Sequence, residues 1–271
     1  MMHNTSSAHS ISPLICSRAV AVLMAIVIAA PVFAGPPLAT DDPETLPKGR
    51  FELNTAYVLN LSPRSADGAA GRTWQHDAPR FDLAYGFAEG IQLKIEFPLS
   101  VIDPADGQHA RAGIGDASFG SKIRFVREDE WPVAISIYPA VGIPIGNRNQ
   151  GLGTGKPSLV FPVQIGRHFL DDKLWVYGDA GYEEQFAHGE PDIWFAGFAA
   201  EYEVAEGVTI VGEVRGEFGV RDAPDDSFFN IGVKWKLIDY ASFIGTAGRS
   251  FNPTPDSGAD LRLYLGIQWT F

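Results

Sequence analysis

The sequence predicts an all-β protein: an antiparallel transmembrane β-barrel of about twelve strands behind a cleaved N-terminal signal peptide. Three observations lead to this prediction. The final segment, residues 261–271, alternates apolar and other residues without a break and ends on Trp269 and Phe271. Segments with the same alternation recur along the chain, and their connections are alternately long and short. An apolar run near the N-terminus has the composition of a secretion signal.

The first 34 residues form the predicted signal peptide. Arg18 precedes an apolar run over residues 19–30, and residues 31–34 end on Ala34, a small residue of the kind found at cleavage sites. The alternative, a membrane anchor, is disfavoured because a spanning helix needs roughly 20 apolar residues. The sole cysteine, Cys16, lies in this segment, so the predicted mature chain has no disulfide, metal thiolate or thiol nucleophile.

A Pro-rich leader, residues 35–49, separates the signal peptide from the predicted barrel domain, residues 50–271. The leader contains four prolines and few groups that could pack, which predicts an extended segment on the periplasmic side. Its paired carboxylates, Asp41 and Asp42, are more simply interpreted as solvated charge than as an acid–base pair or calcium ligands.

Twelve strands are predicted in the barrel domain. They cover residues 51–59, 81–87, 91–99, 117–125, 133–141, 159–165, 176–182, 194–202, 208–218, 229–236, 241–251 and 261–271. An even strand number with alternating short and long connections is typical of bacterial barrels, whose short turns face the periplasm. Pro98, Pro139 and Pro162 fall inside predicted strands, where proline indicates a bulge, a rim position or a displaced boundary.

Charged residues occupy the strand faces opposite the apolar stripes. In a soluble sandwich, the alternative fold, this face would be solvated. In a barrel it lines the lumen, because a basic residue facing lipid near mid-membrane costs roughly 2–4 kcal/mol. A closed barrel also leaves no unpaired strand edge in hydrocarbon. The predicted lumen-lining residues are Glu52, Arg80, Asp82, Lys94, Glu96, Lys122, Arg124, Asp179, Glu213, Arg215, Glu217, Lys234 and Arg262.

Aromatic residues gather beside the predicted short turns. Rings of this kind are enriched where the hydrocarbon of a bilayer meets its headgroups. The sequence therefore predicts an aromatic girdle at the periplasmic end, formed by Trp131, Trp175, Trp235, Trp269 and Phe271.

Composition and motif context exclude several classes of function. The chain has 33 acidic and 21 basic residues, a net charge of −12, which argues against nucleic acid as a partner. The Gly-rich residues 151–156 lack the helix that a phosphate-binding loop requires, because Pro157 and a strand follow. We predict no cofactor and no metal site.

An outer-membrane hydrolase is the alternative from another functional class. Its site would need a histidine held against a serine and a third orienting group. His76, His109, His168 and His188 lie in predicted loops or turns, but no serine stands in a recognisable nucleophile context. We therefore do not predict an enzyme.

Four short motifs carry a family resemblance. They are Gly-Ile-Gly-Asp at residues 113–116, Gly-Ser-Lys at 120–122, Pro-Ile-Gly at 144–146 and Gly-Leu-Gly-Thr-Gly-Lys at 151–156. They resemble motifs of the outer-membrane transporter family named after the phenol meta-degradation pathway. The resemblance implies a barrel of twelve or a similar number of strands that passes small, often aromatic or hydrophobic, compounds. It offers no catalytic residues to carry over.

These observations together predict a channel in the outer membrane of a Gram-negative bacterium. Eight-stranded barrels are filled by side chains and barrels of 16–18 strands hold water, so about twelve strands predict a narrow passage for small molecules. A non-transporting structural barrel is a further alternative. The expected partners are outer-membrane lipid, a small-molecule substrate and the barrel-assembly machinery, which would read the C-terminal strand.

Overall fold

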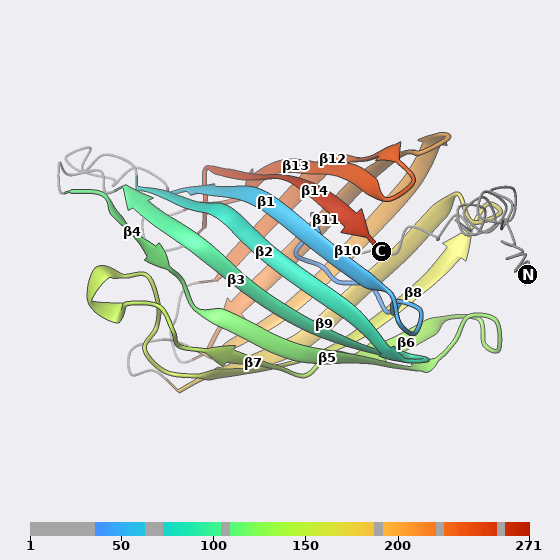
Figure 1. The fold of residues 1–271 in the computed structure, drawn as a ribbon, viewed down its shortest axis with the longest axis horizontal. Coiled ribbons are helices and arrows are strands. Elements are labelled where there is room, and N and C mark those ends of the chain that lie inside the picture. The colour runs from blue at the N-terminus through green and yellow to red at the C-terminus, as the bar shows by residue number, and fades with distance from the viewer. Residues whose placement is uncertain (1–35, 63–72, 104–108, 187–191, 221–224, 254–257) are drawn as a thin grey trace, which may run out of the picture. The chain divides into compact units, whose positions relative to one another are not determined.

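Period-two alternation produces long strands through most of the chain (Figure 1). The structure is a computed structural model that describes residues 36–271 except 63–72, 104–108, 187–191, 221–224 and 254–257. The predicted signal peptide and Cys16 lie outside these residues. The strands are β1 (Phe51–Leu61), β2 (Trp74–Ala88), β3 (Ile91–Asp103), β4 (Arg111–Ile114), β5 (Ala117–Val126), β6 (Ala134–Ile137), β7 (Ala140–Ile143), β8 (Ser158–Phe169), β9 (Leu174–Gln185), β10 (Ile193–Ala205), β11 (Val208–Gly219), β12 (Asp226–Ile238), β13 (Ala241–Ser250) and β14 (Leu261–Thr270).

The sheet closes on itself through antiparallel pairing of its first and last strands. Leu53 in β1 lies opposite Trp269 in β14, and Leu61 lies opposite Leu261. Segments β4 and β5 both pair with β3, whereas β6 and β7 both pair with β5 and β8, so each couple forms one interrupted strand. The fold is therefore a closed antiparallel barrel of twelve strands, as the sequence predicts.

The two interruptions coincide with prolines. Tyr138 and Pro139 separate β6 from β7, and Gly115 and Asp116 separate β4 from β5 beside Pro98. Proline cannot donate a ladder hydrogen bond, but its carbonyl still accepts one. Accordingly, Ser121 N donates to Pro139 O at 3.1 Å, and Gly115 N donates to Pro98 O at 3.0 Å. Pro162 instead stays inside β8, opposite Gly181.

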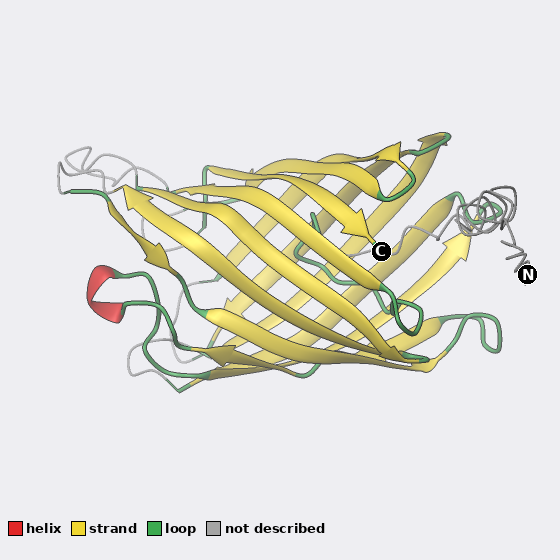
Figure 2. Ribbon diagram, in the orientation of Figure 1, coloured by secondary structure: helices red, strands yellow, loops and turns green. Residues whose placement is uncertain are grey.

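Short and long connections gather at opposite ends of the barrel. The turns at residues 89–90, 127–133, 170–173, 206–207 and 239–240 lie at one end with the C-terminus (Figure 1). The loops, one of which carries the 3₁₀ helix Arg148–Gln150, lie at the other end (Figure 2). In outer-membrane barrels the short-turn end faces the periplasm.

The outer face of the barrel is apolar and exposed. Val163 in β8 is 46% exposed and Ile231 in β12 is 59% exposed, although both lie in the middle of their strands. Such exposure is costly in water but favourable against lipid tails. Together with the barrel fold, this face indicates the outer membrane of a Gram-negative bacterium. Among the described residues, no helix is long and apolar enough to span a membrane.

The structure corrects one member of the predicted aromatic girdle. Trp131, Trp235 and Phe271 are exposed, whereas Trp175 is only 6% exposed and packs against Tyr177 and Ala199. The reason is the alternation of β9, which puts Trp175 on the same inward face as Tyr177. The distance of a residue from a turn determines its depth in the membrane. Its position in the alternation of the strand determines whether its side chain faces the lumen or the lipid.

Candidate functional site

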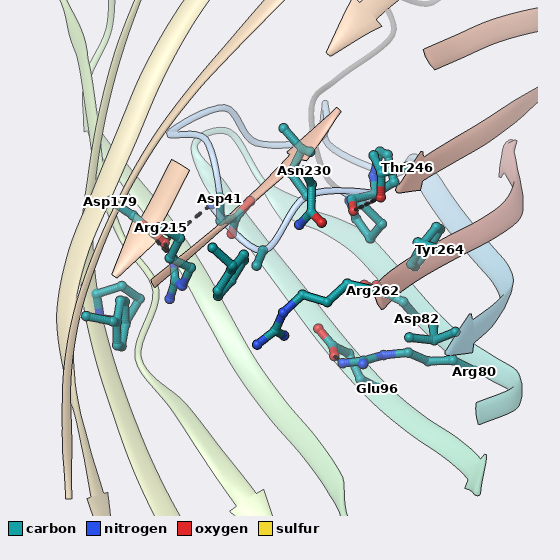
Figure 3. A pocket seen from close by; sticks show the side chains of 18 of the residues that line it. Asp41, Arg80, Asp82, Glu96, Asp179, Arg215, Asn230, Thr246, Arg262 and Tyr264 are labelled. Atoms are coloured by element: carbon teal, nitrogen blue, oxygen red, sulfur yellow. Dashed lines mark hydrogen bonds and ion pairs between the residues drawn. The ribbon is translucent and has the colours of Figure 1, made fainter. Parts of the chain in front are cut away.

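A cavity of about 390 Å³ occupies the interior of the barrel (Figure 3). Side chains from β2, β3 and β14 line one side, and side chains from β9 and β11 line another. Figure 3 shows Arg80, Glu96 and Arg262 on the first side and Asp179 and Arg215 on the second. The cavity therefore lies where a solute would have to pass through the barrel.

Ion pairs hold most of the charged groups around this cavity. Arg215 Nη1 lies 2.8 Å from Asp179 Oδ1, and Arg80 Nη2 lies 2.8 Å from Glu96 Oε2. Lys94 Nζ lies 2.8 Å from Asp82 Oδ2 and 3.0 Å from Glu96 Oε1. Opposite charges are thus paired along the strand faces, so the wall presents dipoles more than isolated charges.

Aromatic rings that were not among the predicted lumen residues share the wall with these charges. The guanidinium carbon of Arg215 lies 4.4 Å from the ring centroid of Phe195, and that of Arg262 lies 4.0 Å from the centroid of Phe228. Both are cation–π contacts. Phe195 has the same parity as Glu201 in β10, and Phe228 has the same parity as Lys234 in β12. This shared inward parity is the signal that could have revealed both rings.

Inward-facing glycines make room for the rings. A Cβ atom on Gly181 would lie 2.6 Å from the ring of Phe195, and one on Gly120 would lie 2.6 Å from the ring of Tyr138. Both distances are too short for ordinary contact, so glycine allows each aromatic ring to lie flat along the wall.

A second cavity, of about 310 Å³, lies beside the first on the side of the long loops. Arg80 and Glu96 line both cavities, and Asp116 and Lys156 line only the second. The Arg80–Glu96 ion pair therefore stands at the junction of two consecutive spaces.

Asp116 organises the loop at this second cavity. Its Oδ1 accepts a hydrogen bond from Gly146 N at 2.9 Å, and its Oδ2 accepts from Thr154 N at 2.7 Å. A Cβ atom on Gly153 would lie 2.3 Å from Asp116 Oδ1. The acidic residue of the 113–116 motif thus holds the glycine motifs of the following loop, which explains why these short motifs occur together.

Part of the Pro-rich leader lies inside the barrel. We call residues 36–46 the lumen segment. The composition of the leader predicts an extended segment with little to pack against, but Thr40, Asp42, Thr45 and Leu46 are buried among strand side chains. In Figure 3 the blue chain that carries Asp41 runs between the Asp179–Arg215 pair and the Arg80–Glu96 pair. The lumen segment therefore forms one wall of the central cavity, to which residues 36–39 and Asp41 contribute.

Basic and amide side chains hold the acids of the lumen segment. Lys122 Nζ donates to Asp41 Oδ1 at 2.9 Å and to the carbonyl oxygen of Asp42 at 2.7 Å. Gln164 Nε2 donates to Asp41 Oδ2 at 3.0 Å, and Arg124 pairs with Glu44. From the sequence, Asp41 and Asp42 are interpreted as solvated charge. That interpretation is wrong, because Asp42 is 1% exposed and the charge of Lys122 requires a partner inside the barrel.

Strand carboxylates hold the backbone of the lumen segment. Both oxygens of Glu213 accept from Ala39 N, at 3.0 and 3.1 Å, and Oε2 also accepts from Thr40 N at 2.7 Å. Gln92 Oε1 accepts from Leu46 N at 2.8 Å. Leu38 packs against the cluster that contains Trp175. A segment without regular structure thus has its backbone groups satisfied by side chains.

The structure places the thirteen predicted lumen residues on the inner side of the wall. Seven of them line the central cavity, namely Arg80, Asp82, Lys94, Glu96, Asp179, Arg215 and Arg262. Lys122, Arg124 and Glu213 contact the lumen segment instead. The other three form hydrogen bonds within the wall. Glu217 accepts one from Arg215, Lys234 donates one to Glu201 at 2.7 Å, and Glu52 accepts one from Asn54.

Two of the described histidines, His76 and His168, have partners other than serine. His168 Nδ1 lies 2.8 Å from Glu128 Oε2, and His76 Nδ1 lies 2.6 Å from the Tyr57 hydroxyl. No hydrogen bond joins a histidine to a serine among the residues that the structure describes, and His188 lies outside them. Within the same residues, no group of three or more His, Cys, Asp or Glu side chains could hold a metal ion.

Comparison with known proteins identifies the fold. No family model matches the chain, and no curated protein matches its sequence. An outer-membrane channel from Pseudomonas putida F1 has a TM-score of 0.70 at 15% identity, over 88% of this chain and 100% of that one. The KdgM porin has a TM-score of 0.52 at 12% identity, over 81% and 99%. The NanC porin has a TM-score of 0.53 at 7% identity, over 81% and 98%. The chain therefore has the fold of outer-membrane β-barrel channels.

Proposed function

We propose that this protein is an outer-membrane channel that passes small compounds by passive diffusion. The observation that carries the proposal is the pair of consecutive cavities inside the barrel, which meet at the Arg80–Glu96 ion pair. The structural neighbours, which are channels and porins, support the same class of function.

We further propose that the preferred solutes are small aromatic or hydrophobic compounds, and that the chain belongs to the phenol meta-pathway transporter family. Phe195, Phe228 and Tyr138 support this preference, because they line a cavity of about 390 Å³ whose charged groups are largely paired with one another. The family proposal is supported by Asp116, whose contacts give the glycine motifs a common structural role.

Solute flux into proteoliposomes tests the channel function. Three solutes separate the properties that could govern passage. Benzoate is aromatic, cyclohexanecarboxylate is apolar but not aromatic, and a trisaccharide is larger than both. We expect benzoate to enter fastest and the trisaccharide to be excluded. If no solute shows protein-dependent flux, the channel function is refuted and the protein is a non-transporting structural barrel. Equal flux of the two carboxylates would refute the aromatic preference and leave the channel in place.

Two valines of β8 provide a matched pair of variants. Val160 lines the central cavity, whereas Val163 is exposed on the outer face. We expect Val160→Trp to slow benzoate flux several-fold by filling the cavity, and Val163→Trp to leave it unchanged because its ring faces lipid. Equal flux through the two variants would place the path outside this cavity.

A further inference from the structure

We infer that the lumen segment, residues 36–46, is a movable plug that determines which solutes cross the barrel, by size and by charge. This inference rests on the proposed channel function. It assigns solute selection to a segment outside the barrel wall.

The position of the lumen segment is the first argument. It contacts Gln92 in β3 and Lys122 in β5 on one side, and Glu213 in β11 and Thr246 in β13 on another. These strands are far apart in the order of the sheet. The segment therefore crosses the interior of the barrel. A solute moving from the central cavity toward the short-turn end would meet it.

The way in which the segment is held is the second argument. Residues 36–46 belong to none of the strands, so no ladder of backbone hydrogen bonds joins them to the wall. Their hydrogen bonds run to side chains such as Glu213 and Lys122, and water can replace these partners one by one. Elements with few regular backbone bonds open at lower free energy than the strands around them. The segment can thus leave while the barrel stays closed.

Two glycines in the wall form a seat for the segment. A Cβ atom on Gly86 in β2 would lie 2.8 Å from the carbonyl oxygen of Leu46, the last residue of the segment, and 2.0 Å from that of Pro47, the residue that follows it. A Cβ atom on Gly197 in β10 would lie 2.1 Å from Thr40 Oγ1 and 3.0 Å from Thr40 Cβ. Any other residue at either position would push the chain off the wall, so the wall is shaped to receive it.

Charge gives the plug its second role. The segment carries two carboxylates paired with wall cations, Asp41 with Lys122 and Glu44 with Arg124. With the segment in place these cations are neutralised. With the segment displaced, the lumen loses these two carboxylates and gains two unpaired cations. Displacement therefore shifts permeability toward anions as well as widening the path.

Planar-bilayer recordings of glycine variants test the inference. We expect Gly86→Ala and Gly197→Ala to raise single-channel conductance about twofold or more, because the open cross-section sets ion flow. The reversal potential in a KCl gradient should move toward the chloride potential. Gly212→Ala is the matched control, because the nearest atom to its added Cβ, Asn230 O, lies 3.7 Å away. A variant that lacks residues 36–46 should show the largest increase in conductance and the largest shift of the reversal potential toward the chloride potential.

A thiol reporter follows the segment without relying on conductance. Thr45 is 2% exposed, so a cysteine there should react slowly with a bulky maleimide in a Cys16→Ser background. Adding Gly86→Ala should speed the reaction at least several-fold.

If the reporter becomes reactive while conductance and reversal potential stay unchanged, the inference is wrong and the channel function stands. If the reporter stays protected in both glycine variants, neither substitution displaces the segment. The variant that lacks residues 36–46 is then the test, and a conductance equal to that of the parent protein would overturn the inference. If no form of the protein conducts, the channel function and the inference fall together. If only the displaced forms conduct, the plug stands and the proposed passive flux through the resting protein does not.

Discussion

Lys122 and Asp41 meet inside the barrel with Nζ 2.9 Å from Oδ1, although 81 residues separate them in the chain. The pair joins the lumen segment to β5. Lys122 is 2% exposed, so its charge depends on Asp41 and on the Asp42 carbonyl oxygen for compensation.

This pair predicts a measurable coupling. Lys122→Met should lower the free energy of unfolding by about 1–3 kcal/mol, because it leaves buried carboxylate and carbonyl groups without a donor. The double variant Lys122→Met/Asp41→Asn should lose less than the sum of the two single variants. Urea unfolding in lipid vesicles, followed by tryptophan fluorescence, measures all four proteins. Additive losses would show that the two side chains do not interact in the bilayer.

Asp116 predicts the behaviour of the loop that carries the 3₁₀ helix. Removing its carboxylate with Asp116→Ala should free Gly146 N and Thr154 N and loosen residues 145–154. Trypsin should then cleave after Arg148 faster than in the parent protein, as read by mass spectrometry. Asp116→Asn keeps one acceptor oxygen and should give an intermediate rate. Cleavage at the parental rate in Asp116→Ala would mean that other contacts hold the loop.

The outer face predicts a dependence on depth in the membrane. Ile231 lies in the middle of β12, whereas Leu237 lies on the same face beside the turn at residues 239–240. Ile231→Lys should cost about 2–4 kcal/mol of unfolding free energy in vesicles, and Leu237→Lys should cost about 0–1 kcal/mol. Equal costs, or a smaller cost for Ile231→Lys, would contradict the assignment of this face to lipid.

Phe271 predicts an effect on assembly that is separate from stability. Its backbone N donates to Phe51 O at 2.9 Å, and its carbonyl accepts from Phe51 N at 3.1 Å, so both rings lie at one end of the β1–β14 seam. We expect Phe271→Ala to reduce the amount of folded barrel in cells, if the assembly machinery reads the terminal aromatic residue. Phe51→Ala, the control, should reduce it much less, whereas the two purified proteins should unfold at similar urea concentrations. Heat-modified mobility on gels measures assembly. Equal yields of the two variants in cells would argue against recognition of Phe271.

The strand faces were predictable because side-chain alternation is a local property. Glu213 and Arg215 have inward parity in β11 whatever the rest of the chain does, and a charged face cannot meet hydrocarbon at an acceptable cost. The same reasoning applies to Trp175. Trp175 lies on the same face of β9 as Asp179, which assigns it to the lumen. The prediction that it belongs to the aromatic girdle rested only on its position near a turn.

The sequence by itself determined the strands, their even number, the lipid-facing stripe and the charged lumen, because each follows from period two and from the solvent that each face can tolerate. Only the tertiary structure decided where the leader lies. Its partners Lys122, Gln164 and Glu213 stand 80 to 174 residues away, and no local pattern indicates that closure brings them around one segment. Barrel closure converts three distant strand faces into one binding surface, and that surface gives the buried acids of residues 36–46 their partners.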